Sequence, residues 1–568
     1  MKKAISLLLS LLTLLSALSI GLTAFAGESE TVTKFAVASD LHFNKPSEEM
    51  TIYDDTSEIF GYANRRAAME DESGYIIDEF LTQCKNDPSI EFVLIPGDVC
   101  DDGRTIFEDH EIMAEKFRKF EEESGKPIYL INGNHDTSTL DTEFNNDMFY
   151  ETYYEFGFDE AIDTLEGTLS YTADLNDKYR LIACDSCDPS VSTEDGLTAK
   201  RVNWICKMAK KATAEGKYPI LMMHHNFIDH MPIQRIISRN FIVRNHSLTA
   251  AKLANAGIRL AFTGHEHGSD VASYTSLSGN KIYDFSTTSL TMYPLQYRVM
   301  TLTDSEIKYE ARQIEKIDTD ALTAATKGYT QEQIDYMNSD LAAYSKEFLK
   351  QGIKYRLALG FTEEKLGVEE SSAFYSLVMT AVKGLTKLLE MPLYGENSVQ
   401  QLAKEYNILL PESDYENGWD IITELMSYHY AGDEPFTVDS PTVTLILRIA
   451  ALILLDDLST VNDEVFFGYI NNFLKEKGSG DLFKSVTKLA ASTFGPYTAG
   501  ELFITAIASP IIYGFCLDTD TPDNNGTVEG YGINNNKENA KEAFSAFFQK
   551  IITYVKLFFG YLTTGIRG

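Results

Sequence analysis

Five short groups of residues with metal-binding side chains recur in the first half of the chain. They combine aspartate, asparagine and histidine, and they are Asp40-Leu41-His42, Gly97-Asp98, Gly133-Asn134-His135-Asp136, His224-His225 and Gly264-His265-Glu266-His267. Carboxylate, amide and imidazole ligands together suit Mn, Fe or Zn better than Ca or Mg, which prefer shells made only of oxygen. We therefore expect these groups to form a metal site.

The number of candidate ligands predicts two divalent metal ions rather than one. Two cations about 3.5–4 Å apart need one shared ligand, several ligands of their own and a position left for solvent. Asp98 is the natural shared ligand, because a carboxylate has two oxygens. Asp40 and His42 alternate, as do His265 and His267, so extended backbone would point each pair to one side.

Each group follows an apolar run that is typical of a buried β-strand. The runs cover residues 35–39, 92–96, 127–132, 219–223 and 258–263. Helical stretches lie between them, which indicates crossover units and strands buried on both faces. In open α/β sheets the ligand crevice lies outside the carboxyl ends of the strands. Any one pair could be a capping or core residue, but five groups at strand ends favour a common site.

The set of groups resembles the motifs of the calcineurin-like metallophosphoesterase family. The matching patterns are D-x-H, G-D-x-x-x-x-G at 97–103, G-N-H-D, a histidine at a strand end, and G-H-x-H. The resemblance covers about residues 33–315, and it is greatest to the cyclic-nucleotide phosphodiesterase-like branch. It implies an α/β fold, a four-layer α/β/β/α sandwich of two mixed sheets, and a metal-dependent phosphoric ester hydrolase.

The resemblance also implies roles for individual residues. One metal would be held by Asp40, His42, Asp98 and His267, and the other by Asp98, Asn134, His224 and His265. His135 would face the leaving group as a catalytic imidazole that binds no metal, and the carboxylate of Asp101 would orient it. His225 stays an alternative to His224, because the family has a single histidine there. The family's phosphoprotein phosphatases carry D-R-G where this chain has Asp101-Asp102-Gly103, which disfavours phosphoprotein substrates.

These roles predict hydrolysis of phosphomonoesters or phosphodiesters, nucleotides among them, by a hydroxide that bridges the two metals. An alternative is a phosphodiesterase that acts on phosphodiesters of the cell envelope or of lipids. A second alternative is a non-enzymatic surface-binding protein, although binding alone would not need the complete ligand set. A formal net charge of −35 argues against a nucleic-acid duplex as partner and leaves a small phosphoester.

The two ends of the chain carry segments that bear on localisation. Residues 1–26 combine two lysines, an apolar run and a terminal Ala24-Phe25-Ala26, which is typical of a cleaved signal peptide and predicts a secreted protein. An uncleaved membrane anchor is the alternative. Residues 541–568 have one apolar stripe at helical spacing. This amphipathic helix would either dock on the preceding domain or lie on a membrane at the cell surface.

Between these ends the sequence predicts a catalytic domain at 30–316, an all-α accessory domain at 317–516 and a flexible linker at 517–540. The runs 281–290, 296–302 and 307–314 predict antiparallel strands that close a second sheet behind the first. A capping box at 330–333 and an apolar helix at 442–455 support the helical domain. The aromatic segment 137–178 would either cover the leaving group or form a small core of its own.

Overall fold

The computed structural model describes residues 32–50, 67–187, 197–231, 234, 241–360, 375–437, 440–455, 521–533, 536–541 and 544. The predicted signal peptide at 1–26 lies outside these residues, as do most of the predicted amphipathic helix at 541–568 and residues 456–516 of the predicted helical domain.

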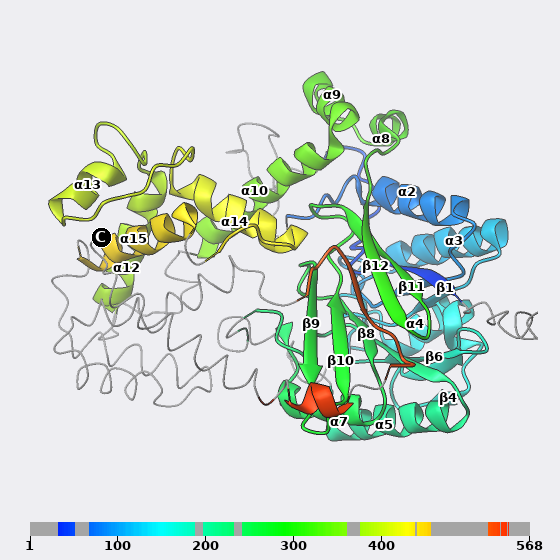
Figure 1. Ribbon diagram of the computed structural model, residues 1–568. Coiled ribbons are helices and arrows are strands. Elements are labelled where there is room, and N and C mark those ends of the chain that lie inside the picture. The colour runs from blue at the N-terminus through cyan, green and yellow to red at the C-terminus, as the bar shows by residue number, and fades with distance from the viewer. Residues whose placement is uncertain are drawn as a thin grey trace, which may run out of the picture.

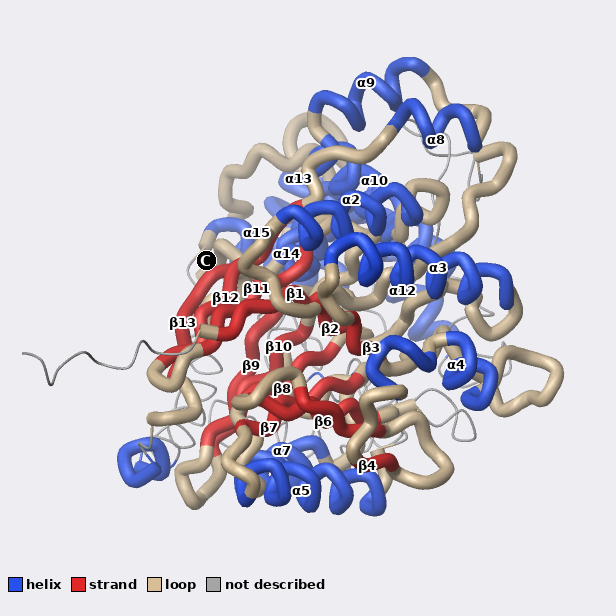
Figure 2. Tube along the Cα trace, turned by 90° about the vertical axis from the view of Figure 1, so that its right-hand side faces the viewer, coloured by secondary structure: helices blue, strands red, loops and turns tan. Residues whose placement is uncertain are grey.

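Two mixed β-sheets form the centre of the amino-terminal domain (Figures 1 and 2). The first sheet has the order β13-β12-β11-β1-β2-β3, with strands β1 (Thr33–Val37), β2 (Val93–Ile95), β3 (Ile128–Leu130), β11 (Gln296–Leu302), β12 (Glu306–Gln313) and β13 (Asn525–Glu529). The second has the order β4-β5-β6-β7-β8-β10-β9, with β4 (Asp163–Thr164), β5 (Tyr171–Asp174), β6 (Tyr179–Cys184), β7 (Tyr218–Met223), β8 (Leu260–Thr263), β9 (Asp270–Thr275) and β10 (Lys281–Ser286). The five predicted strand runs are confirmed as β1, β2, β3, β7 and β8.

Helices cover the outer face of each sheet and complete the predicted four layers (Figure 2). Helices α2 (Ser73–Asn86) and α3 (Phe107–Ser124) lie over the first sheet, and α5 (Ala199–Ala214) and α7 (His246–Asn255) over the second. Strands β1, β2 and β3 run parallel, as do β6, β7, β8 and β10. The predicted α/β sandwich of two mixed sheets is therefore confirmed.

Aromatic side chains fill the space between the two sheets. The rings of Phe35 on β1 and Phe92 beside β2 stack with centroids 4.7 Å apart. Phe35 also meets Phe262 of the second sheet edge-on at 5.6 Å, and Phe262 meets Phe285 at 5.8 Å. All four side chains are buried, so the hydrophobic effect holds the sheets face to face. This contact keeps the carboxyl ends of β1, β2, β7 and β8 close together.

The prediction for the last three strands of the domain is partly wrong. The run 281–290 contains β10, but β10 pairs parallel to β8 in the second sheet. Strands β11 and β12 do form an antiparallel hairpin, yet they lie beside β1 in the first sheet. The connection between β10 and β11 crosses from one sheet to the other, where Leu290 N donates to Ser39 O (3.1 Å) beside Asp40.

The predicted flexible linker at 517–540 contains a strand, which corrects that prediction. Residues Asn525–Glu529 form β13, which pairs antiparallel with β12 at the edge of the first sheet (Figure 2). Beyond it, the ring of Tyr531 stacks on Tyr218 at 4.7 Å. The polar, glycine-rich composition resembles that of a linker, but pairing with an existing sheet edge supplies the backbone hydrogen bonds that composition does not reveal.

The described part of 317–516 is helical, as predicted. It comprises α8 (Thr319–Ala325), α9 (Gln331–Ser339), α10 (Leu341–Gly360), α12 (Tyr375–Glu390), α13 (Val399–Glu405), α14 (Gly418–Ala431) and α15 (Pro441–Leu455). The capping box is present at the start of α9, where Thr330 and Gln333 satisfy each other's backbone N–H groups. Helix α15 packs in a separate apolar cluster with Leu388 and Leu425. Among the described helices, none combines the length and the apolar character needed to cross a membrane.

The aromatic rings of segment 137–178 pack mostly into the main core of the domain rather than form a lid of exposed rings. It contains α4 (Asn146–Thr152) and the turn η1 (Tyr154–Phe158). Tyr153, Phe156 and Phe158 are buried, and only Tyr154 of the four candidate rings is exposed, at 45%. The sequence left open a cover for the leaving group or a small separate core, but three of the four rings belong to the main core of the domain.

Candidate metal centre

The five groups of candidate ligands lie in loops that directly follow β1, β2, β3, β7 and β8. Three of these strands belong to the first sheet and two to the second, and their carboxyl ends meet where the two sheets face each other. Two sets of ligand atoms combine only predicted ligands, each with its members within 4.8 Å of one another, and a third set joins His42 to Asp101 and His135. The first two sets are Asp40, His42, Asp98 and His267, and Asp98, His224 and His265.

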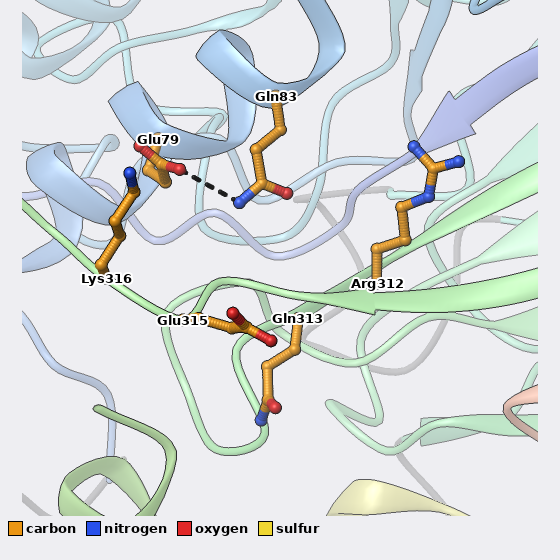
Figure 3. Close-up of a pocket in the computed structure, with 6 residues that line it drawn as sticks. All are labelled: Glu79, Gln83, Arg312, Gln313, Glu315 and Lys316. Atoms are coloured by element: carbon orange, nitrogen blue, oxygen red, sulfur yellow. Dashed lines mark hydrogen bonds between the residues drawn. The ribbon is translucent and has the colours of Figure 1, made fainter. Parts of the chain in front are cut away.

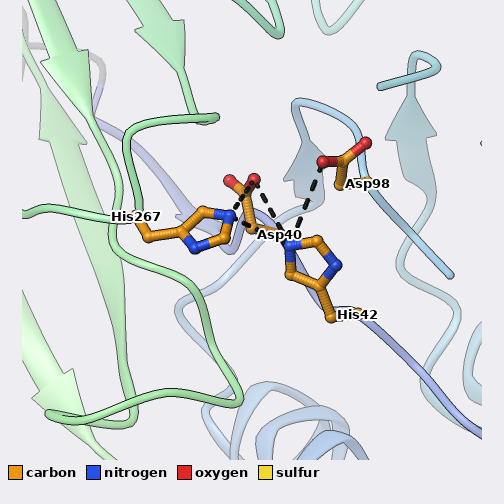
Figure 4. Close-up of side chains that lie close together, drawn as sticks. All are labelled: Asp40, His42, Asp98 and His267. Carbon is orange, nitrogen blue, oxygen red and sulfur yellow. Dashed lines mark hydrogen bonds and ion pairs between the residues drawn. The ribbon is translucent and has the colours of Figure 1, made fainter. Parts of the chain in front are cut away.

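The first set gathers two imidazoles and two carboxylates (Figure 4). Nε2 of His42 lies 3.0 Å from Nε2 of His267, which is itself 3.3 Å from Oδ1 of Asp40. Nε2 of His42 is also 3.9 Å from Oδ2 of Asp98. Asp40, His42 and Asp98 are buried, whereas the His267 side chain is 19% exposed. The set therefore opens to solvent on the side of His267.

The second set shares Asp98 with the first. Nε2 of His224 lies 3.2 Å from Oδ2 of Asp98 and 2.9 Å from Oδ1 of Asn134. His265 is the third member of this set. The predicted ligands of both metals are thus brought together, with Asp98 between the two halves as expected for the shared carboxylate.

A hydrogen bond orients His224, and a close contact with a carboxylate orients His42, so that Nε2 of each faces the site. Nδ1 of His224 donates to the carbonyl of Pro96 (3.0 Å), and Nδ1 of His42 faces Oδ1 of Asp101 at 2.9 Å. A neutral imidazole that donates through Nδ1 presents the lone pair of Nε2, which is the form that binds a metal. The Nε2 lone pairs of the ligand histidines and the carboxylates of Asp40 and Asp98 converge at these distances. They repel one another unless positive charge lies between them. The residues therefore fit a pair of divalent cations.

The electrostatics of the cluster agree with this fit. Burial raises the pKa of Asp40, but the hydrogen bond and charge of His267 and the charge of His224 outweigh it and lower the pKa to about 2. Burial likewise opposes ionisation of Asp98, and His224 and His135 nevertheless hold its pKa well below the usual value. For His224, burial lowers the pKa, but Asp98 and Asp40 raise it to about 9. The carboxylates thus attract a positive charge into a buried site.

The ligand loops have backbone conformations that side chains other than glycine rarely adopt. Asp40, His42, Asp98, His265 and His267 all have φ between 41° and 68°, in the left-handed region. They make up five of the eleven non-glycine residues with positive φ in the part of the chain that the structure describes. Left-handed backbone costs on the order of 1 kcal/mol per residue and concentrates at functional sites. The predicted extended alternation of Asp40 with His42 and of His265 with His267 is therefore wrong, because turns point these side chains inward.

Three glycines allow the loops to approach so closely. A Cβ atom on Gly133 would collide with the Asp98 carboxylate, and one on Gly264 would collide with Ser39 and the Asp40 carboxylate. A Cβ on Gly97 would lie 2.8 Å from Nδ1 of His224. The glycines that precede Asp98, Asn134 and His265 in the motifs are therefore required by packing around the ligands.

The two histidines after β7 have different surroundings. His225 turns Nδ1 to the hydroxyl of Ser186 (2.9 Å), and it belongs to neither set of ligand atoms. Burial and the neighbouring His224 lower the pKa of His225 to about 3. The geometry therefore favours His224 over His225 as the ligand from this loop.

His135 and Asp101 lie beside the first set but are connected differently from the prediction. Nδ1 of His135 donates to the backbone carbonyl of Asp101 at 2.7 Å, while the carboxylate Oδ1 of Asp101 is 4.0 Å from that nitrogen. The same Oδ1 lies 2.9 Å from Nδ1 of His42. Asp101 thus orients His135 through its main chain and a candidate metal ligand through its side chain. The His135 side chain is 25% exposed, so a substrate can reach it.

Sequence reasoning did not assign a role to Asp136, the last residue of the G-N-H-D motif. Its buried carboxylate accepts from the backbone N–H groups of Val99 (2.9 Å), Cys100 (3.1 Å) and Gly133 (2.7 Å). It therefore clamps the loop after β2 to the loop after β3. Arg104 was also not singled out, although its backbone N–H donates to His135 O (3.2 Å) and its guanidinium to Asn134 O. The place of Asp136 in the G-N-H-D motif could have indicated its role from the sequence. Arg104 lies outside the motifs, so the sequence contained no such indication for it.

A cavity of about 400 Å³ elsewhere on the domain contains none of the predicted site residues. It lies between α2 and the end of β12 and is lined by Glu79, Gln83, Arg312, Gln313, Glu315 and Lys316 (Figure 3). Arg312 there is paired with Asp87 (2.8 Å) and Glu310 (2.6 Å). This cavity has no cluster of ligand atoms, so the chemistry is assigned to the strand ends.

Two mixed sheets between helices, with Asp98 shared by two groups of ligand atoms, define a dinuclear metallohydrolase type of site. The model of the calcineurin-like phosphoesterase family matches residues 33–269. Residues 33–269 therefore form a calcineurin-like phosphoesterase domain, and its Asp and His clusters are those of a metal-dependent phosphoester hydrolase.

The solved structures that match part of this chain include two phosphatases. A dimetal phosphatase from Danio rerio is 11% identical, with a TM-score of 0.36, and the match covers 50% of this chain and 96% of that one. A purple acid phosphatase from yellow lupin seeds (Lupinus luteus) is 12% identical, with a TM-score of 0.30 and coverage of 50% and 52%. No curated protein sequence gives a significant match.

Proposed function

We propose that the protein is a secreted enzyme that hydrolyses small phosphomonoesters or phosphodiesters, nucleotides among them, with two divalent ions of Mn, Fe or Zn. The observation that carries the proposal is the position of Asp98 within both sets of ligand atoms. A single carboxylate placed between two buried groups of imidazoles is the arrangement that a pair of cations requires. Secretion is supported by the pattern of residues 1–26 alone.

When bound, the two cations would supply the positive charge that activates water and neutralises the phosphoryl oxygens. The chain itself would contribute the geometry. Asp40, His42 and His267 would hold one cation, and Asn134, His224 and His265 the other, with Asp98 bound to both. The left-handed loops and the clamp made by Asp136 keep these side chains in place before substrate arrives.

His135 is the group best placed to assist the leaving oxygen. The bond from Nδ1 to the Asp101 carbonyl fixes the ring, so Nε2 is the atom that would hold a proton for the leaving group. The side chain is 25% exposed, whereas Asp40, His42 and Asp98 are buried, so His135 is accessible to a substrate. We therefore assign His135 to general-acid assistance rather than to metal binding.

A substrate screen of the metal-loaded full-length protein tests the proposal. Phosphomonoesters, linear phosphodiesters and cyclic nucleotides should be compared at equal concentration, with Mn²⁺, Fe²⁺ or Zn²⁺ added and with a chelator. We expect turnover of at least one class that requires the cation and is lost with the chelator. Metal binding without turnover of any phosphoester would contradict the proposed function and leave a binding role.

A further inference from the structure

A buried junction joins the loop at residues 264–270, which we call the metal loop, to parts of the chain that lie outside the family domain. Ser269 N donates to the carbonyl of Tyr430 (3.2 Å) at the end of α14. Asn524, which precedes β13, donates from Nδ2 to the carbonyl of Ala431 (2.9 Å) and accepts from the hydroxyl of Ser269 (3.2 Å). Three segments more than 90 residues apart thus meet directly behind His267.

Asp523 is at the centre of this junction and is 1% exposed. Its Oδ1 accepts from Val271 N (2.9 Å), at the exit of the metal loop, and its Oδ2 accepts from Asp433 N (2.8 Å). In return, Asp523 N donates to Oδ1 of Asp433 (2.8 Å). Each aspartate therefore accepts a hydrogen bond from the backbone of the other. The Asp523 carboxylate also bonds Val271, so it connects the metal loop to the segment around Asp433.

Arg298 on β11 closes the junction from the first sheet. It is 2% exposed, and its guanidinium donates to the carbonyls of Asp523 and Ser286 (2.7 Å for the latter) and to the hydroxyl of Ser269 (2.8 Å). A buried cation is costly unless it is paired and hydrogen-bonded. Without Asp523, Arg298 would therefore lose one hydrogen-bond partner beside the metal loop.

The close approach also depends on Gly432, whose φ is 73°. A Cβ atom there would lie 2.6 Å from the carbonyl oxygen of Ser269 and 2.8 Å from Cβ of Asp523. Only glycine allows the end of α14 to lie against the metal loop at this distance. The fit is thus specific on the side of the helical region as well.

We propose that Asp523 is a positioning residue for the metal centre, which acts by holding the metal loop and thereby His265 and His267. The proposal rests on the dinuclear site proposed above. Both histidines have left-handed backbone, which persists only where the surrounding structure enforces it. Strand β8 holds the entry of the loop and the Asp523 junction holds its exit. The helical region and the segment around 523 are therefore supporting parts of the active site.

The variant Asp523→Asn in the full-length chain tests the proposal, because the amide puts an N–H donor where a carboxylate accepted from a backbone N–H. Isothermal titration with Mn²⁺ and Zn²⁺ measures the dissociation constants, and circular dichroism measures the unfolding temperature without metal. We expect roughly tenfold weaker binding of one of the two cations, as for other residues that support metal ligands. With saturating metal, kcat on nitrophenyl phosphate should recover and KM should not change.

Arg259→Gln is the matched control, because Arg259 anchors the same carboxyl-terminal segment at the opposite end of β8. Its guanidinium donates to the carbonyls of Gly530 and Ile533 (2.9 Å for the latter). This variant should lower the unfolding temperature and leave the metal dissociation constants unchanged. Equal weakening of metal binding in both variants, or none in Asp523→Asn, would overturn the proposal.

Ser269→Ala is a milder second variant, which removes one bond from Arg298 and one to Asn524 while Asp523 stays in place. It should weaken binding of one cation by a few-fold. If Asp523→Asn does not fold, wild-type metal binding by Ser269→Ala overturns the proposal. A wild-type protein that binds neither cation would instead overturn the proposed function itself, and this inference with it.

Discussion

At the scale of single residues, Asp98 is the side chain on which the two halves of the metal centre depend. Asp98→Ala should abolish turnover and release metal, because it removes the only carboxylate common to both sets of ligand atoms. Elemental analysis of the purified variant measures the loss. Asp102→Ala, at an exposed position of the same loop, is the control and should keep its metal. Two ions per chain and normal turnover in the Asp98 variant would disprove the shared ligand.

His135→Ala should have a different effect from loss of a ligand. Metal content should stay near that of the wild type, while turnover falls by roughly 10²–10⁴-fold, the usual range for lost acid–base assistance. The loss should be smaller for a nitrophenyl ester, whose leaving group needs little protonation. Parallel rate measurements on a nitrophenyl and an alkyl phosphoester make the comparison. An equal loss on both would point to a positioning role.

At the scale of elements, the site depends on loops that leave their strands in left-handed turns. Short buried strands bring the loops to one edge, and glycines let the loops touch. Away from the site, burial also changes the ionisation of a carboxylate where α3 meets β3. There, Glu121 near the end of α3 accepts from Ile128 N at 2.6 Å.

Glu121 provides a test of how burial affects stability. Burial raises its pKa to about 7, although the bond from Ile128 opposes this, and Asp159 and Glu155 add to the rise. A folded-state pKa above the unfolded value means that stability falls as the pH rises from about 4.5 through 7, since ionisation is harder in the folded state. Glu121→Gln should therefore be more stable than wild type at pH 8, by on the order of 1 kcal/mol after solvent screening, and equal at pH 4.

Denaturant unfolding at pH 4 and pH 8 measures this difference. Glu122→Gln, at the exposed neighbouring position, is the matched control and should change stability little at either pH. A Glu121→Gln chain that is no more stable than wild type at pH 8 would show that solvent or the Ile128 bond compensates for burial of the charge.

At the scale of the whole molecule, the carboxyl-terminal part completes the fold of the family domain. A chain that ends at Glu315 keeps all nine predicted ligand and catalytic residues but lacks β13 and the Asp523 junction. We expect it to be poorly soluble, because the edge of β12 and apolar surface become exposed. Size-exclusion chromatography, metal content and turnover of the soluble fraction measure the effect.

The full-length chain is the reference for that truncation. A monomeric, metal-loaded truncation with full turnover would show that everything after Glu315 is accessory. A soluble, metal-loaded truncation without activity would show instead that the later segments contribute to the reaction itself.

The candidate ligands and the strands that carry them could be predicted from the sequence. Asp40, His42, Asp98 and the other ligands are recognisable because ligand chemistry is a property of residue type, and the strands because burial on both faces leaves a continuous apolar run. The sequence motifs also contain the glycines, because only a residue without Cβ allows the neighbouring loops to pack against Asp98 and Asp40.

The connections between these local pieces could not be predicted from the sequence. The carboxylate of Asp101 faces His42 rather than His135, His224 rather than His225 meets Asp98, and residues 523–529 join the sheet and the metal loop. The contacts of Asp101 with His42 and of Asp523 with Val271 join residues that are 59 and 252 positions apart. The choice between His224 and His225 depends on which of the two side chains the turn points inward. Local pattern reflects the burial of a residue and its nearest neighbours, and it holds no information about partners that chain folding brings from that distance.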